Sequence, residues 1–123
     1  MVGIVVVSHS QKLSEGVLDL VQTMSPDAKI CAAGGRTHGL FGTSAKRIKK
    51  AIMSVYSEDG VVVLMDLGSA IMVTEDVVKE LGMDNIVIVD APIAEGAVAA
   101  AFVATDHAPL SDVKAAAIAA KSQ

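Results

Sequence analysis

The sequence predicts a single-domain α/β fold of the doubly wound, Rossmann-like or flavodoxin-like kind, with about four parallel strands in the order 2-1-3-4 and helices on both faces. Short runs rich in β-branched residues are almost entirely apolar, which is typical of strands covered on both faces. Segments with apolar residues at helical spacing alternate with these runs, as they do in βαβ units. No linker or change in composition divides residues 1–123, so we expect one domain.

The predicted strands are the segments 3–7, 28–33, 60–65 and 85–89. The first, third and fourth are continuously apolar and contain runs of Val and Ile, which favour strands. The second carries Cys31, the only cysteine of the chain, which excludes an internal disulfide. We interpret Cys31 as a small buried residue rather than as a redox group.

Helical spacing of apolar residues recurs between successive strands. The residues concerned are Leu13, Val17, Leu20, Val21 and Met24, then Ile48, Ile52 and Val55, then Val73, Val77, Val78 and Leu81. Gly82 follows the third pattern and suits a left-handed C-terminal cap. Beyond the fourth strand, the Ala-rich segments 94–104 and 111–121 are predicted helices, the second with Ser111 as its N-cap. Their small side chains suit close packing, on the sheet or against a partner subunit.

Small, polar and titratable residues follow the predicted strands, at the edge where open parallel sheets bind their ligands. His9 comes directly after the first strand, and Asp66 comes directly after the third. Because these strands are expected to be neighbours, Asp66 can approach His9. A carboxylate that accepts a hydrogen bond from one ring nitrogen fixes the tautomer and leaves the other nitrogen free to attack. From position alone, a loop histidine without a task and a solvated aspartate also stay open.

Two loops at the same edge are suited to bind an anion. The glycine-rich segment 34–44 leads into the second helix, and its backbone N–H groups can approach phosphate closely. Its glycines match neither a Walker A loop nor GxGxxG, which excludes a dinucleotide fingerprint. Thr43 is predicted to cap the second helix, and Ser69, next to Gly68, to cap the third. His38 lies inside the first loop and is interpreted as a surface histidine.

Composition excludes several classes of function. The net charge is −4 and aromatic residues make up 2%, so the chain lacks the basic stripe and stacking platforms of nucleic-acid binders. No Cys and His spacing suggests a metal site, and no run is long enough for a membrane span. We therefore expect a cytoplasmic protein without a signal peptide. The basic cluster, formed by Lys46, Arg47, Lys49 and Lys50, is either a solvated face or a surface that steers an acidic partner.

Several short motifs, in their order and spacing, resemble one family over nearly the whole chain. They are Val6-Val7-Ser8-His9-Ser10, Glu15-Gly16-Val17, Gly42-Thr43-Ser44, Met65-Asp66-Leu67-Gly68-Ser69-Ala70 and Ala91-Pro92-Ile93-Ala94-Glu95-Gly96. The chain resembles the mannose-type IIA phosphocarrier domains of the bacterial sugar phosphotransferase system. The resemblance implies that His9 accepts phosphate from the phosphocarrier protein HPr and passes it on, and that Asp66 orients His9. It implies no cofactor and no metal ion.

The segment from Asp66 to Ala70 departs from the transporter-type members of that family. Those members carry a longer segment with a tryptophan and paired glycines, which this sequence lacks. The chain is more similar to the phosphotransferase subunits of PEP-dependent dihydroxyacetone kinases. The implied acceptor is ADP held on the nucleotide-binding subunit of such a kinase. Two alternatives are a transporter-type domain that donates to a IIB domain and a non-catalytic regulatory domain of the same fold.

The resemblance also implies how the phosphoryl group and the partners are bound. Amides and hydroxyl groups near the strand ends would bind the phosphoryl oxygens. The residues predicted for this role are Ser10, Gly35, Thr43, Gly68 and Ser69. We expect HPr to be a separate protein, because the chain stops after one domain, and we expect a homodimer. No exchange of a final strand is expected in that dimer, since no strand pattern follows Ala104.

Overall fold

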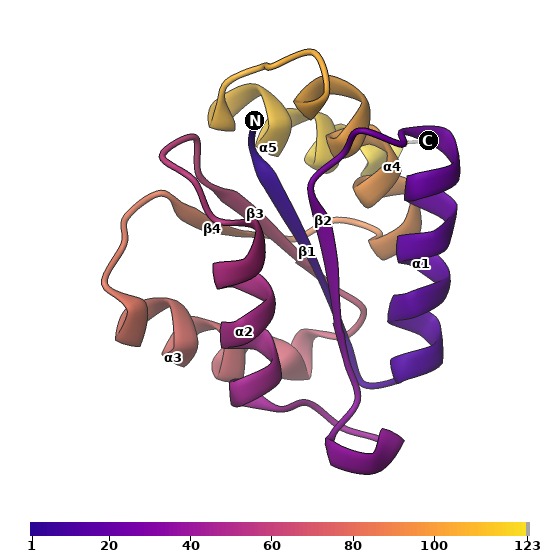
Figure 1. The fold of residues 1–123 in the computed structure, drawn as a ribbon, viewed down its shortest axis with the longest axis vertical. Coiled ribbons are helices and arrows are strands. Elements are labelled where there is room, and N and C mark those ends of the chain that lie inside the picture. Colours follow the sequence, from indigo (N-terminus) through magenta and orange to yellow (C-terminus); the bar gives the residue numbers. More distant parts are fainter. Residues whose placement is uncertain (123) are drawn as a thin grey trace.

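The computed structural model describes residues 1–122 and contains one four-stranded parallel sheet (Figure 1). The strands are β1 (Gly3–Ser8), β2 (Ile30–Gly34), β3 (Val61–Met65) and β4 (Ile86–Val89). Their order is β2-β1-β3-β4, and each neighbouring pair is parallel. The predicted α/β class, the four strands and their order are confirmed, although β2 begins two residues later than predicted.

Helices cover both faces of the sheet. The α-helices are α1 (Gln11–Met24), α2 (Ala45–Val55), α3 (Ile71–Leu81), α4 (Ile93–Ala104) and α5 (Leu110–Ala119), and the 3-10 turns are η1 (Thr37–Gly39), η2 (Gly68–Ala70) and η3 (Ala120–Ser122). In Figure 1, α1 lies on one side of the sheet and α2 and α3 lie on the other. The α1 side also holds α4 and α5, whose alanines share its core. Gly82 ends α3 in the left-handed conformation (φ 71°), as predicted.

The central strand β1 separates two hydrophobic cores. Ile4 and Val6 pack into the core with α1, α4 and α5, whereas Val5 and Val7 pack into the core with α2 and α3. All four side chains are fully buried. Burial on both faces explains why the strand is continuously apolar instead of alternating. Each such side chain contributes about 1.5–3 kcal/mol relative to exposure.

The prediction that Thr43 and Ser69 are helix N-caps is wrong. Ser44 caps α2, because its backbone is extended (φ −130°, ψ 119°) and its Oγ accepts a hydrogen bond from the Arg47 amide at 3.3 Å. Thr43 lies one residue too early for this bond. Ser69 lies within η2, and Ala70 flanks the start of α3 without a side-chain cap. The Ser69 hydroxyl has a different partner, described below.

The segment beyond β4 forms helices, as predicted, but Ser111 is not the N-cap of the last one. α5 begins at Leu110, because the carbonyl of Pro109 accepts a hydrogen bond from the Val113 amide at 3.1 Å. Pro109 itself lacks an amide proton, which suits it to the start of a helix. Within residues 1–122, no strand follows β4, and no helix combines the length and apolar character needed to cross a membrane.

The functional edge of the sheet lies where β1 and β3 end side by side. Val7 is the register partner of Met65, and the Asp66 amide continues the ladder by donating to the Val7 carbonyl at 3.1 Å. Strand order reverses between these two strands, since the chain continues from β1 outward to β2 and then returns to β3. Such a reversal creates a crevice for ligands. His9 and Asp66 leave the sheet at this point.

Candidate active site

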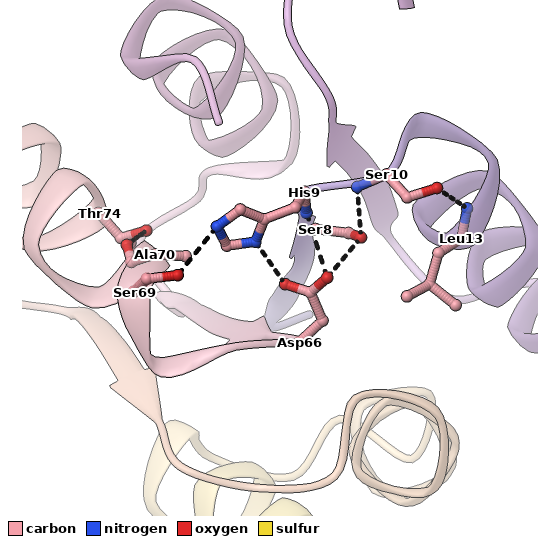
Figure 2. Close-up of polar contacts among 8 residues, drawn as sticks. All are labelled: Ser8, His9, Ser10, Leu13, Asp66, Ser69, Ala70 and Thr74. Atoms are coloured by element: carbon pink, nitrogen blue, oxygen red, sulfur yellow. Dashed lines mark hydrogen bonds and ion pairs between the residues drawn. The ribbon is translucent and has the colours of Figure 1, made fainter. Parts of the chain in front are cut away.

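His9 and Asp66 contact each other at the end of the two central strands, although they lie 57 residues apart in sequence. Nδ1 of His9 lies 3.1 Å from Oδ1 of Asp66 (Figure 2). The His9 side chain is 13% exposed and the Asp66 side chain is 11% exposed. The pair is therefore largely shielded from water while one part of the imidazole stays accessible. This arrangement suits a histidine whose orientation is fixed by a carboxylate.

A second set of hydrogen bonds holds Asp66 from the opposite side. The Ser8 hydroxyl donates to Asp66 Oδ2 at 2.9 Å, and the His9 amide donates to the same oxygen at 3.1 Å. The Ser8 oxygen in turn accepts from the Ser10 amide at 3.0 Å. Ser8 is fully buried, so its hydroxyl needs these partners. The sequence analysis assigned no role to Ser8. The one feature that could have indicated this role is the position of a polar residue at the end of an otherwise apolar strand.

The hydrogen bonds keep Asp66 ionised. Burial of the carboxyl group opposes ionisation, but the hydrogen bonds from the side chains of His9 and Ser8 and from the His9 amide outweigh it. Together they hold the pKa of Asp66 below its ordinary value of 3.8. Near neutral pH the carboxylate is therefore an acceptor only, and His9 Nδ1 must carry the proton that it shares with Asp66.

Ser69 contacts the other ring nitrogen of His9. Its Oγ lies 3.0 Å from Nε2, and Figure 2 shows the imidazole between Ser69 and Asp66. With the proton on Nδ1, a neutral imidazole has its lone pair on Nε2, which accepts a hydrogen bond from the Ser69 hydroxyl. The lone pair of a neutral His9 is thus on Nε2, and Ser69 marks its direction.

The predicted phosphate ligands lie on three loops that surround His9. The amides of Ser10 and Gly35 donate to the Ser8 hydroxyl and the Ser8 carbonyl, each at 3.0 Å, so they already have acceptors. The amides of Gly68 and Ser69 have no protein acceptor among the described residues. Thr43 follows a glycine whose amide donates to the His9 carbonyl at 2.8 Å. Of the Ser10, Gly35, Gly68 and Ser69 amides, those on η2, beside Nε2, are thus the ones without an acceptor among the described residues.

Phe41 is a neighbour of His9 that the sequence interpretation missed. The centroids of the two rings lie 5.5 Å apart, with 35° between their planes. Phe41 belongs to the glycine-rich loop, where no periodic pattern of apolar residues marks it as a contact of His9. His38 in the same loop is exposed and has a positive φ of 64°. Within residues 1–122, His38 makes no hydrogen bond to the His9 centre.

A cleft of about 590 Å³ opens beside the site, between the ends of β3 and β4. Asp66, Gly68, Asp90 and Lys121 are among the residues that line it. Two of these residues are paired, since Lys121 Nζ donates to Asp90 Oδ2 at 2.8 Å. In residues 1–122, no group of three or more His, Cys, Asp or Glu side chains is arranged to hold a metal ion.

Comparison with known proteins identifies the family of this chain. The family model EIIA-man, described as the PTS system fructose IIA component, matches residues 3–116, and the chain belongs to this family. Its curated relatives include a phosphoryl donor subunit DhaM of PEP-dependent dihydroxyacetone kinase 1 from Listeria innocua. That protein is 41% identical over 108 residues, which cover 87% of this chain and 86% of the relative. The resemblance expected from the sequence motifs is confirmed.

Other similar proteins support the assignment of the chain to this family. The phosphotransferase subunit DhaM of a PTS-dependent dihydroxyacetone kinase from Lactococcus lactis is 33% identical, over 91% of this chain and 89% of that protein. The Escherichia coli DhaM is 37% identical over 92% of this chain, which spans 25% of that longer protein. A crystal structure of a protein of unknown function, EF1359, has a TM-score of 0.83 at 28% identity and covers 95% of this chain and 92% of its own.

Proposed function

We propose that this protein is the phosphoryl donor subunit of a PEP-dependent dihydroxyacetone kinase and that it carries the phosphoryl group on Nε2 of His9. The observation that carries the proposal is the pair of contacts on the imidazole. Asp66 occupies Nδ1 at 3.1 Å, and the Ser69 hydroxyl lies 3.0 Å from Nε2. Nε2 therefore has the lone pair that a nucleophile needs, and it becomes free once the Ser69 hydroxyl turns away.

The proposed donor is phospho-HPr. The lone pair of Nε2 forms a bond to phosphorus while the P–N bond to the HPr histidine breaks, and the electrons of that bond stay on the HPr imidazole. The ring of His9 then carries a positive charge, which the Asp66 carboxylate stabilises through Nδ1–H. The amides of Gly68 and Ser69 have no other acceptor among the described residues and can bind the phosphoryl oxygens.

The proposed acceptor is ADP held on the nucleotide-binding subunit of dihydroxyacetone kinase. A terminal oxygen of ADP forms a bond to phosphorus while the Nε2–P bond breaks, which returns His9 to its neutral form and produces ATP. The names of the relatives support this acceptor. The short segment from Asp66 to Ala70 also supports it, since transporter-type domains carry a longer one.

Phosphorylation with PEP, enzyme I and HPr tests the donor step. We expect the wild type to gain an acid-labile phosphoryl label and His9→Ala to gain none, because no other histidine of the described residues is hydrogen-bonded to Asp66. His38→Asn is the matched control, since Asn tolerates the positive φ of 64° at that position and His38 is exposed. Persistent labelling of His9→Ala, with the same acid lability, would disprove the assignment.

Discharge of the phosphorylated protein tests the acceptor step. We expect loss of label, with formation of ATP, on addition of the ADP-loaded kinase subunit. Discharge to a mannose-type IIB domain alone would instead establish the transporter alternative. A non-catalytic regulatory domain would not be labelled in the first place, so the two experiments separate all three functions.

The same proposal includes a homodimer that works in the cytoplasm. HPr and the kinase subunit would approach the same exposed edge around His9 in turn, because donor and acceptor react with one atom. The basic cluster on α2 can steer an acidic partner toward this edge. Its members are Lys46, Arg47, Lys49 and Lys50. Of these, only Lys49 has a carboxylate partner in the described chain, Glu80 at 2.9 Å.

A further inference from the structure

Phe41 is a large apolar side chain in the loop before α2, and 69% of it is exposed. Exposure of a phenyl ring to water costs free energy. A large apolar side chain that is exposed beside a reactive group therefore indicates a functional role for it. Its ring centroid lies 5.5 Å from that of His9. This separation is in the range in which tilted aromatic rings attract each other. Phe41 is thus a third neighbour of the imidazole, besides Asp66 and Ser69.

Hydrogen bonds fix the backbone of this loop against His9. The amide of Gly42 donates to the His9 carbonyl at 2.8 Å, and Arg36 Nε donates to the Phe41 carbonyl at 2.8 Å. The Arg36 amide donates to the Leu40 carbonyl at 2.7 Å, which closes the turn. Gly42 has φ 131°, and a Cβ there would lie 2.9 Å from Arg36 Nε, so the loop requires glycine. The backbone of Phe41 is therefore held next to His9 on both sides of the residue.

We propose that Phe41 is a positioning residue for His9, an inference that rests on the proposed function and extends it. For Nε2 to attack phosphorus, the Ser69 hydroxyl must first release its lone pair. The side chain is then held by a single hydrogen bond, from Nδ1 to Asp66, about which the ring can swing. Contact with Phe41 limits this swing and keeps Nε2 directed at the donor at the moment of bond formation.

A small phosphoryl donor tests whether Phe41 orients His9 or instead contributes to the binding of a partner protein. Phosphoramidate transfers its phosphoryl group as its P–N bond breaks, the Nε2–P bond forms and ammonia leaves, and it needs no protein surface. We expect Phe41→Ala to react about three- to tenfold more slowly than wild type, the scale of an aromatic pair contact. The same loss is expected at saturating phospho-HPr, with an unchanged half-saturating concentration.

Matched variants make the comparison specific. Phe41→Tyr keeps the ring and should retain the wild-type rate, whereas Arg36→Met removes the bond to the Phe41 carbonyl and should be intermediate. Phe102→Ala is the control, because Phe102 is 67% exposed, almost the same as Phe41, but lies near the end of α4. That control should react like the wild type.

Three-bond NMR couplings of His9 give a readout that does not depend on phosphorylation. Because Asp66 and Ser69 hold both ring nitrogens in the resting site, the couplings are compared without the Ser69 hydroxyl. We expect one χ1 rotamer in Ser69→Ala and averaged couplings in the double variant Ser69→Ala/Phe41→Ala. A wild-type rate with phosphoramidate, or an unchanged single rotamer, would overturn the positioning role, even where transfer from phospho-HPr is slowed. Failure of the wild type to react with either donor would instead refute the proposed function, and the couplings would still decide the role of Phe41.

Discussion

The carboxylate of Asp66 accepts three hydrogen bonds, and all of them come from the end of β1. Two of the donors belong to His9, its amide and its Nδ1–H, and the third is the buried hydroxyl of Ser8. One carboxylate thus holds both the backbone and the side chain of the proposed nucleophile. These bonds are also the reason that the pKa of Asp66 is lowered, so chemistry and stability are linked at this residue.

Acid stability tests this link. Because the pKa of Asp66 is lower in the folded state than its ordinary 3.8, its stabilising contribution is present above pH 3.8 and is lost as the pH falls through the folded-state pKa. We expect Asp66→Asn to lower the free energy of unfolding at pH 7. We also expect the free energy of unfolding of this variant to depend less on pH below about pH 4 than that of the wild type. Urea denaturation between pH 2 and pH 7 measures both effects.

Asp90→Asn is the control for that experiment. The side chain of Asp90 is 91% exposed, and its one ion pair within residues 1–122 is the surface pair with Lys121, an interaction worth little. This variant should keep the steep acid dependence of the wild type. If Asp66→Asn kept the same steepness, the hydrogen bonds to Asp66 would not be the source of the acid sensitivity.

At the scale of elements, α1 packs against the end of β2 without room for a side chain at Gly34. A Cβ on Gly34 would lie 2.0 Å from the Ser14 hydroxyl and 2.6 Å from the Ser10 carbonyl. Ser14 is fully buried, and Ser10 caps α1 by accepting from the Leu13 amide at 3.2 Å. The position of the first turn of α1, directly after His9, therefore depends on a glycine in the neighbouring strand.

Two alanine substitutions, one in β2 facing α1 and one in α1 itself, should change the free energy of unfolding in opposite directions. Gly34→Ala should lower the free energy of unfolding by about 1–3 kcal/mol, the usual cost of an overpacked site. Gly16→Ala, in the middle of the same helix, should raise it by up to about 1 kcal/mol, since nothing lies within 4 Å and alanine favours helices. Urea denaturation at pH 7 measures both, and equal effects would contradict this packing.

The contrast between strands and loops explains what the sequence could predict. Strands and helices followed from apolar periodicity, and the contact of His9 with Asp66 followed from strand ends that must lie together. The contacts of Ser69 and Phe41 could not be predicted, because they depend on the conformation of two loops that approach the same histidine. Ser69 lies 60 residues from His9 in sequence, and no periodic pattern encodes a distance of that kind.

At the scale of the whole molecule, the small residues of the last two helices serve the internal core. Ala97, Ala100, Ala101 and Ala117 are fully buried, and α4 packs against α5 and the sheet. They therefore fill the chain's own interior, whereas several large apolar side chains stay outside: Met24 is 56% exposed and Met72 is 75% exposed. Exposed side chains of this size are the part of the surface that an association would cover.

A homodimer is the expected state of this chain in solution. Light scattering at micromolar concentration should give twice the chain mass of 12.6 kDa. The mass should be independent of ionic strength, because burial of apolar surface is not screened by salt. A monomer mass at these concentrations would contradict the prediction and leave the phosphorylation chemistry of His9 unaffected.

The shared carboxylate at the end of β1 also has a thermodynamic consequence. With its amide and its ring bonded to Asp66 and its ring beside Phe41, His9 has already lost conformational entropy in the folded protein. An arriving phosphoryl donor therefore orders little of this chain, and the free energy of association can go into bringing phosphorus onto the line of Nε2. A carrier that must receive and release the same group many times gains from this rigidity in both directions, because the ordering is done once, when the chain folds.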